Sequence, residues 1–253
     1  MGASKHTSDV YVDRFDEIRD RLPGAGLPWL KNLRSGAIER FADCGLPNSR
    51  VEEWKYTNLS RILDPQPVLA GPSVNGVHRA SLKQYYLDPT PCHRMVFVNS
   101  YYRPDLSETG VLPAGLTLCS LETALADRSE LLEAHWGILH DLSEDRLSGK
   151  NDLKPHAMTA LNTAFAAGGA VIHLDHNVSL DGPIHLIYLT VREGGRPEMS
   201  HPRTLVVAEA GAHATVFETF IGNGGDAHCC NALTQVSVGP GARVCHYKHQ
   251  GEA

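Results

Sequence analysis

The stretch Thr204–Phe220, TLVVAEAGAHATVFETF, decides the fold of this chain. It consists of two runs rich in β-branched residues, and the runs meet at Gly211. Runs of this kind between turn residues predict β-strands. Glycine suits the corner because it turns the backbone there without a steric penalty from a Cβ atom. The stretch therefore predicts a unit of strand, turn and strand.

The same kind of unit occurs before and after this stretch, in Val171–Leu189 and in Leu233–His249. The three corner glycines, Gly182, Gly211 and Gly241, are 29 and 30 residues apart. No helical pattern separates the strands, so a sheet wound from alternating strands and helices is not expected. A fixed period of this length predicts stacked coils in which each unit buries its face against the next. An antiparallel sandwich or jelly roll has similar hairpin spacing, and the pattern alone leaves both architectures open.

The first part of the chain has the period of helices. Apolar residues at helical spacing predict a helix with Tyr11, Phe15, Ile18 and Leu22 on one face. A second helix should follow and end at Gly45 as its C-cap. Two further helices are expected at 129–139 and 154–169. A short β element is expected before them, at 94–102 with 115–121, and a surface excursion at 64–76.

The sequence thus predicts two regions that together are mainly β with α. Residues 1–150 should form a mainly helical N-terminal region with a short β element. Residues 151–253 should form the first coils of a β core that is incomplete at its C-terminal end, because a stack of coils needs a cap.

Composition narrows the class of protein and its location. The 253 residues carry a formal net charge of −6, which argues against nucleic acid as a main partner, since phosphate binding needs clustered lysine and arginine. No run approaches the roughly 20 apolar residues of a membrane span, and the N-terminus has no apolar signal region. The six cysteines include no C-x-x-C pair. We expect a cytoplasmic protein with reduced thiols and no membrane insertion.

His228, Cys229 and Cys230 form the most suggestive local group of residues. Adjacent cysteines in a strand point to opposite faces, so they cannot hold one ion together. We interpret the group as a loop with incidental thiols, and whether Cys229 and Cys230 have any role stays open. A metal site here would need ligands from neighbouring coils, with the candidates His213, Cys245 and His246.

The remaining histidines and the glycine-rich turns also lack a motif. His173 and His185 are candidate neighbours on adjacent strands, but exposed strand faces often carry histidine. No nucleophile elbow and no phosphate-binding loop is present in the sequence. We therefore predict no catalytic, cofactor-binding or metal-binding residue in this chain.

The stretch Val51–Leu59, VEEWKYTNL, predicts a crowded start of a helix. Ser49 and Glu52 have the spacing of a capping box, so a helix should begin here. Val51, Trp54, Leu59 and Ile62 should face inward. Thr57 and Asn58 should interrupt this helix and cap another that begins at Leu59.

With its preceding arginine, this stretch resembles a family signature. RVEEWKYTNL, residues 50–59, is similar to the Arg-x-Glu-x-Trp-Lys-Tyr-Thr-Pro-Leu signature near the N-terminus of SufD-type subunits in the SufB/SufD family of iron–sulfur assembly proteins. Asn58 stands where proline is common. The resemblance continues, in the same order along the chain, in residues 160–174, 183–189 and 201–220.

The resemblance implies a fold and a function. The family fold is a helical N-terminal region, a right-handed parallel β-helix and a helical C-terminal region. The C-terminal region and the distal β-helix, which dock a SufC-type ATPase and SufB, have no counterpart in this sequence. The implied function is that of a non-catalytic scaffold subunit with SufB and SufC as partners; a homodimer is the other pairing. The iron–sulfur cluster and ATP belong to the complete complex, so no cofactor is expected in this chain.

A metal-dependent cupin-like β-barrel enzyme is the alternative function. The 14 histidines and the β-rich second half of the chain favour it. The close His-x-His pair with a downstream glutamate and histidine, which a three-histidine barrel site needs, is absent from the sequence.

Overall fold

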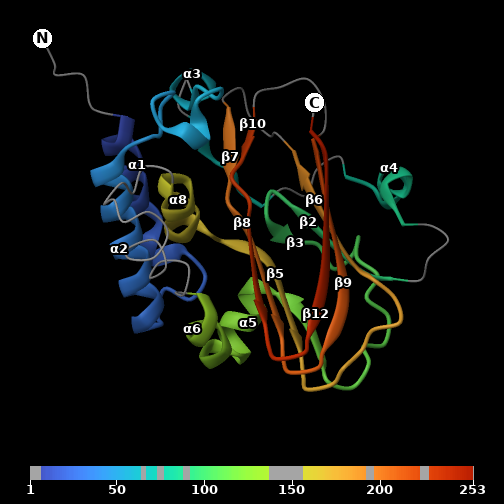
Figure 1. Ribbon diagram of the computed structural model, residues 1–253. Coiled ribbons are helices and arrows are strands. Elements are labelled where there is room, and N and C mark those ends of the chain that lie inside the picture. Colours follow the sequence, from blue (N-terminus) through green and yellow to red (C-terminus); the bar gives the residue numbers. More distant parts are fainter. Residues whose placement is uncertain are drawn as a thin grey trace, which may run out of the picture. The chain divides into compact units, whose positions relative to one another are not determined.

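The computed structural model describes residues 7–63, 67–72, 77–87, 92–136, 156–191, 197–222 and 228–252 (Figure 1). The chain divides into two compact units, and each unit consists of two segments. Unit 1 comprises Met1–Gln66 and Ala124–Ala167, and unit 2 comprises Pro67–Thr123 and Gly168–Ala253. The boundary expected between residues 150 and 151 lies outside the described residues.

Unit 1 is helical among its described residues. The apolar face predicted for its first helix is confirmed at Tyr11, Phe15 and Leu22, which are buried, and the Tyr11 ring meets the Phe41 ring edge-on at 5.4 Å between centroids. Gly45 ends the second helix with a φ of 65° and donates its N–H to Phe41, as predicted. The helices and short 3₁₀ turns are α1 Thr7–Ile18, Arg19–Arg21, α2 Pro28–Cys44, Glu52–Trp54, α3 Leu59–Ile62, α6 Ser129–Trp136 and α8 Ala157–Phe165. Helix α5, Leu121–Asp127, has residues in both units.

The predicted helix start at VEEWKYTNL is corrected in part by the structure. Glu52–Trp54 forms only a 3₁₀ turn, and no side chain caps it, so the capping box is not made. Asn48 satisfies this backbone instead, since its side chain accepts from the Arg50 N–H at 2.9 Å. Asn58 caps α3 as predicted, by accepting from the Arg61 N–H at 3.3 Å.

Of the four residues expected to face inward around this turn, two are buried, Trp54 is partly buried and one is exposed. Val51 and Leu59 are buried. Ile62 is 57% exposed, because α3 ends there after a single turn and no further helical face is formed.

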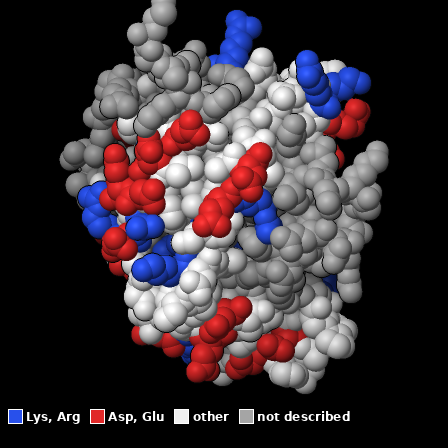
Figure 2. Space-filling model, turned by 90° about the vertical axis from the view of Figure 1, so that its left-hand side faces the viewer, with Lys and Arg blue, Asp and Glu red and all other residues white. Residues whose placement is uncertain are grey.

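Charged side chains of both signs lie close together on one face of the molecule. Figure 2 looks at the left-hand side of Figure 1 and shows basic side chains beside acidic ones. No broad basic surface is seen among the described residues on that face. This distribution does not resemble the basic stripe that a nucleic-acid-binding surface needs.

Unit 2 contains three β-sheets among the described residues. Their strand orders are β1-β7-β10, β11-β8-β5-β4 and β12-β9-β6-β2-β3. The strands are β1 Val68–Leu69, β2 His93–Val98, β3 Tyr101–Tyr102, β4 Leu116–Ser120, β5 Gly168–Leu174, β6 Ile184–Thr190, β7 Glu198–Ser200, β8 Pro202–Ala208, β9 His213–Gly222, β10 His228–Cys230, β11 Leu233–Val238 and β12 Arg243–Gly251. Helix α4, Arg79–Leu82, and the 3₁₀ turn Lys83–Tyr85 also belong to this unit. The expected mixture of helices and strands is confirmed.

The strands from β5 to β12 visit the three sheets in a fixed rotation. Strands one turn of this rotation apart pair in parallel, and the last pairs join residues 30 positions apart: His228 with Glu198, Leu233 with Arg203 and Arg243 with His213. The rotation produces stacked coils with a period close to the predicted one. No sheet among the described residues closes into a barrel, and the antiparallel sandwich that the sequence left open is not formed.

The corners of the coils correct one predicted position and confirm two. Gly211 and Gly241 have φ values of 72° and 70°, as expected at a tight corner. In the preceding coil the corner is Asn177, with a φ of 61°, rather than Gly182. Asparagine tolerates the left-handed region better than most residues. The corners stack, since the Asn177 N–H donates to the Ala210 carbonyl at 2.9 Å and the Gly211 N–H to the Pro240 carbonyl at 3.0 Å.

Two further elements of unit 2 differ from the prediction. Within the expected surface excursion 64–76, Val68–Leu69 forms β1 and pairs in parallel with β7. The short strands β7 and β10 were not predicted. With three residues each, they are too short to show an alternating pattern.

The core of unit 2 lies inside the coils. Alternate residues of β2, β4, β5, β6, β8 and β9 point inward and form one apolar cluster. Three rings stack through successive strands of one sheet: Phe97 on Tyr188 at 4.8 Å, and Tyr188 on Phe220 at 4.9 Å between centroids. None of the helices formed by the described residues has the length and apolar character needed to cross a membrane.

Candidate functional site

A buried carboxylate lies inside the coils of unit 2. Glu218 of β9 is 1% exposed, and it occupies an inward position in line with Val216 and Phe220. Thr204 of β8 donates to Oε1 at 2.5 Å, while Thr234 of β11 and His246 Nε2 of β12 donate to Oε2 at 2.7 and 2.8 Å. The parallel register of the coils brings these residues, far apart in the sequence, around one side chain.

The hydrogen bonds keep this carboxylate ionised. Burial raises the pKa of Glu218, but the hydrogen bonds from His246, Thr204 and Thr234 outweigh it, so the pKa lies below its ordinary value. A buried charge is tolerated when its lone pairs are satisfied in this way.

Tyr188 extends the network deeper into the core. Its hydroxyl lies 2.8 Å from Thr204 Oγ1. Because the Thr204 proton goes to the carboxylate, Tyr188 must be the donor in this bond. Burial raises the pKa of Tyr188 well above 10.0, and the negative charge of Glu218 adds to the effect. The chain Tyr188, Thr204, Glu218 therefore has one fixed direction of donation, which orients the side chains.

The sequence analysis does not predict this network, although the sequence contains a signal for it. In HATVFETF the inward positions alternate as Ala214, Val216, Glu218 and Phe220. A single acidic residue in such an apolar series must be buried with partners. The partners themselves could not be foreseen, because they lie on other strands.

The two adjacent cysteines lie in a strand and not in the expected loop. Cys229 and Cys230 belong to β10 and are in register with Met199 and Ser200 of β7. Burial raises the pKa of Cys229 to about 11 and that of Cys230 to about 12, and the negative charge of Glu252 contributes to both. Since the thiolate is the nucleophile and metal ligand, these raised pKa values favour the protonated thiols near neutral pH.

The candidate ligands from neighbouring coils do not gather around these thiols. His246 bonds to Glu218, while His213 is exposed and in register with Arg243. Cys245 is in register with Thr215 of β9. In the part of the chain that the structure describes, no three side chains of histidine, cysteine, aspartate or glutamate are arranged to hold a metal ion.

The expected neighbourhood of His173 and His185 is wrong. His173 belongs to β5 and His185 to β6, and these strands lie in different sheets. His173 lies 3.3 Å from Glu209 through its Nε2 atom. His185 is buried and bonds to Thr219 at 2.9 Å. Burial, with a smaller contribution from the charge of Arg94, lowers the pKa of His185 to about 4.

Two family models match almost the whole chain in consecutive order. The first, SufBD protein N-terminal region, matches residues 5–186. The second, SUF system FeS cluster assembly, SufBD core domain, matches residues 189–253. The chain belongs to the SufBD family. The resemblance first seen in RVEEWKYTNL is thereby confirmed.

Curated relatives within the SufBD family agree with these matches. An iron–sulfur cluster assembly SufBD family protein of Synechocystis is 31% identical over 235 residues, which cover 88% of this chain and 48% of that protein. The iron–sulfur cluster assembly protein SufD of Bacillus subtilis is 25% identical over 97% of this chain and 53% of its own length. SufD of Escherichia coli is 24% identical over 83% and 44%. The chain thus spans about half the length of these curated relatives.

Proposed function

We propose that this SufBD family chain acts as a SufD-like scaffold in cytoplasmic iron–sulfur cluster assembly, together with a SufB-type subunit and a SufC-type ATPase. The observation that carries the proposal is the consecutive match of the N-terminal and core models over residues 5–186 and 189–253. Two curated relatives that align with most of this chain are named SufD.

The proposed fold of unit 2 is the first part of a right-handed parallel β-helix. The rotation of strands through three sheets and the parallel pairing of successive coils support it. A solenoid of this kind offers a long, rigid surface, which suits a scaffold.

A structural role agrees with the polar groups inside the coils. The carboxylate of Glu218 is held by three donors from its own chain, and the thiols of Cys229 and Cys230 are protonated at neutral pH. On this account the chain itself performs no catalysis and holds no cofactor. The ATP and the assembled cluster belong to the complete complex.

The coil formed by β10, β11 and β12 has open strand edges among the described residues. Strands β10, β11 and β12 each stand at the end of a sheet among the described residues. Val238 and Tyr247 on these strands are exposed. An open sheet edge with exposed apolar side chains needs a cover. We propose that further polypeptide covers it, from the same protein, from a SufB-type subunit or from a second copy of the chain.

The cupin-like barrel enzyme is not favoured by these observations. Its fold needs a closed barrel, and the described strands form three open sheets with coiled connections. The SufBD matches leave little of the chain unassigned.

Complementation tests the proposed role. The complete gene that contains this sequence is introduced into a bacterium whose only cluster assembly pathway lacks its SufD subunit. We expect restored activity of an iron–sulfur enzyme such as aconitase. If expression of the folded protein leaves the enzyme without its cluster, the scaffold assignment is wrong.

A further inference from the structure

A short segment covers the outward face of one sheet in unit 2. Residues 77–87, which contain α4 and the 3₁₀ turn after it, form this cover segment. Its two buried side chains, Val77 and Leu82, pack in one apolar cluster with outward-facing residues of β2, β6 and β9. A hollow of about 90 Å³ remains between the cover segment and the ends of β6 and β9, which is room for a few water molecules. Few buried contacts are typical of segments that open locally.

Near its C-terminal end, the cover segment lies on a buried arginine of β2. The Tyr86 ring stacks on the Arg94 guanidinium, with 3.5 Å between the guanidinium carbon and the ring centroid. Arg94 Nη1 lies 3.3 Å from Oε2 of Glu108, whose side chain is 65% exposed, and Arg94 Nη2 lies 3.6 Å from Cys92 Sγ. The charge of Arg94 is therefore balanced only by a long ion pair to a hydrated carboxylate and by a cation–π contact.

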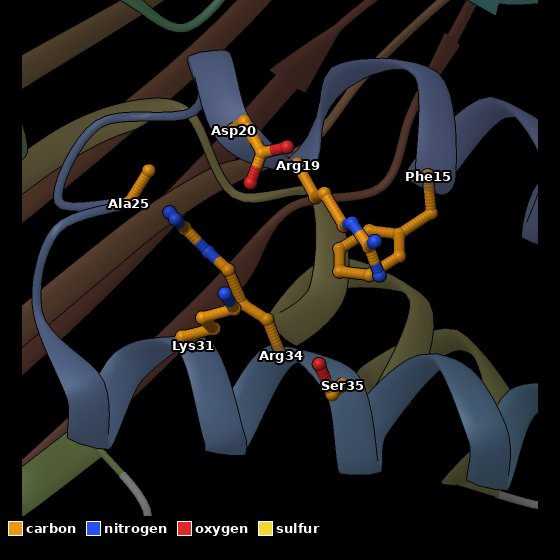
Figure 3. A pocket seen from close by; sticks show the side chains of 7 residues that line it. All are labelled: Phe15, Arg19, Asp20, Ala25, Lys31, Arg34 and Ser35. Atoms are coloured by element: carbon orange, nitrogen blue, oxygen red, sulfur yellow. The ribbon is translucent and has the colours of Figure 1, made fainter.

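A buried arginine in unit 1 shows a firmer arrangement. Figure 3 shows the Arg34 side chain rising from α2 toward Ala25. Arg34 Nη1 donates to the Pro23 carbonyl and Arg34 Nη2 to the Ala166 carbonyl, both at 2.8 Å. Ala166 is the C-cap of α8, and the carbonyl end of a helix favours a positive charge. Among the described residues no backbone carbonyl accepts from the Arg94 guanidinium in this way, so that charge is compensated less completely.

The neighbour of Arg94 on β6 is a fully buried histidine. His185 is in register with Arg94 and is 0% exposed. Its Nε2 lies 2.9 Å from Oγ1 of Thr219 on β9, while its Nδ1 has no hydrogen-bond partner among the described residues. Arg94 is the charged group that faces His185 from β2, and β9 faces it with Phe217 and Thr219, which carry no charge. The cover segment adds Tyr86, which lies on Arg94.

Protonation of His185 would place two positive charges side by side under the cover segment. An imidazolium donates from both nitrogens, and the described residues offer no acceptor to Nδ1–H. Burial, and to a smaller extent the charge of Arg94, lower the pKa of His185 from its ordinary value of 6.5 to about 4. A histidine that is exposed gains its proton at the higher pH. The closed arrangement is therefore fully stable above about pH 6.5 and loses stability as the pH falls toward 4.

We propose that His185, held beside Arg94, forms an acid-sensitive latch that releases the cover segment from the sheet when His185 is protonated. On release, Tyr86 leaves Arg94 and water solvates both positive charges. The outward faces of β2 and β6 then become accessible, while the parallel pairing of the coils persists because the inward core is not involved. This proposal does not depend on the role in cluster assembly.

Hydrogen–deuterium exchange of the complete protein at pH 7 and pH 5, corrected for the pH dependence of chemical exchange, tests the latch. The amides of Ser81 and Tyr86, which donate to carbonyls within the cover segment, should lose protection about twentyfold between these pH values. This factor follows from a pKa of about 4 with the cover closed and 6.5 with it open. The amides of β8 and β9 should keep their protection. Unchanged protection at Ser81 and Tyr86 contradicts the latch, and an equal loss in β8 and β9 shows acid unfolding of the unit instead.

Two glutamine variants assign the pH response to one histidine. His185→Gln keeps a polar group beside Thr219 but gains no proton in this pH range, so the response should fall below about twofold. His249→Gln is the matched control, because His249 is exposed and in register with Thr219 on the same outward face. It should keep the response of about twentyfold. A response that survives in His185→Gln would overturn the proposal.

The titration of the imidazole itself tests the latch without any substitution. In NMR spectra of the unaltered protein, the His185 ring should keep the resonances of a neutral imidazole down to pH 5 while the cover segment is closed. A His185 ring that titrates near pH 6.5, with Ser81 and Tyr86 still protected from exchange, would show that the closed site tolerates the charge. That result would also overturn the proposal.

Discussion

At the scale of single residues, the buried carboxylate of Glu218 is the central polar feature of unit 2. Its charge lies inside a core of apolar side chains and is held by donors from three strands. Removing one of these donors leaves a buried charge with too few hydrogen-bond partners. The network therefore fixes the relative position of β8, β9, β11 and β12 as well as the side chain itself.

Replacing one donor should show the strength of this network. His246→Ala removes the bond to Glu218 and should lower the free energy of unfolding by about 1.5–3 kcal/mol, the range for a hydrogen bond to a charged group. Urea denaturation measures the change. His249→Ala is the control, because His249 lies on the same strand and is exposed. It should cost less than about 0.5 kcal/mol. Equal effects of the two variants would contradict the role given to Glu218.

The thiols of Cys229 and Cys230 make a second residue-scale prediction. Their raised pKa values mean that iodoacetamide should leave both unmodified in the folded protein at pH 7.5, as read by peptide mass spectrometry. The labelling rate should rise about tenfold per pH unit up to pH 10, since the thiolate fraction does. The same chain unfolded in urea is the control. Labelling at pH 7.5 as fast as in urea would show that these thiols are accessible and reactive.

At the scale of elements, the stacked corners decide how one coil is placed on the next. Gly211 and Gly241 both need the left-handed region, but their surroundings differ. A Cβ atom at Gly211 would collide with the Asn177 side chain of the preceding corner. At Gly241 a Cβ atom would meet nothing. Substitutions at the two glycines therefore distinguish the cost of backbone strain from the cost of overpacking.

Alanine at these two corners should give unequal losses of stability. Gly241→Ala should cost about 1–2 kcal/mol for the left-handed backbone alone. Gly211→Ala should cost a further 1–3 kcal/mol or so, because the corner becomes overpacked. Asn177→Gly in the Gly211→Ala background should recover most of this difference. Urea denaturation measures the free energy of unfolding of each variant. A larger loss for Gly241→Ala than for Gly211→Ala would contradict the stacking of the corners.

The sequence predicted many elements well and placed some of them wrongly for identifiable reasons. Runs of β-branched residues between turn residues predicted the long strands correctly, namely β5, β6, β8, β9, β11 and β12. Ser49 and Glu52 have the spacing of a capping box, but in the structure the Asn48 side chain accepts from the backbone N–H of Arg50 instead. The corner at Asn177 was missed because local propensity ranks glycine first, while the pairing of coils selects the position.

At the scale of the whole molecule, pairing between distant strands is what the sequence could not reveal. A period of about 30 residues suits hairpins and coils alike, and only the parallel register distinguishes them. The donors of Glu218 depend on the same register. The family, by contrast, could be seen in RVEEWKYTNL, because a signature can be read without knowing any contact.

Local sequence patterns do not predict the division into two units either. Each unit combines an early segment with a later one, so its core forms only when residues far apart in the sequence meet. Helices α2 and α8 of unit 1 pack together although about 120 residues separate them. Periodicity identifies such elements singly and does not say which of them share a core.

The central claim is that this chain serves as a subunit of a SufB- and SufC-containing assembly. The most direct measurement is co-expression of the complete gene with SufB- and SufC-type genes of the same organism, followed by affinity purification through SufC and mass determination by size-exclusion chromatography with light scattering. The account predicts a stable complex that contains all three chains. A folded product that elutes alone, while SufB and SufC associate without it, would contradict the account.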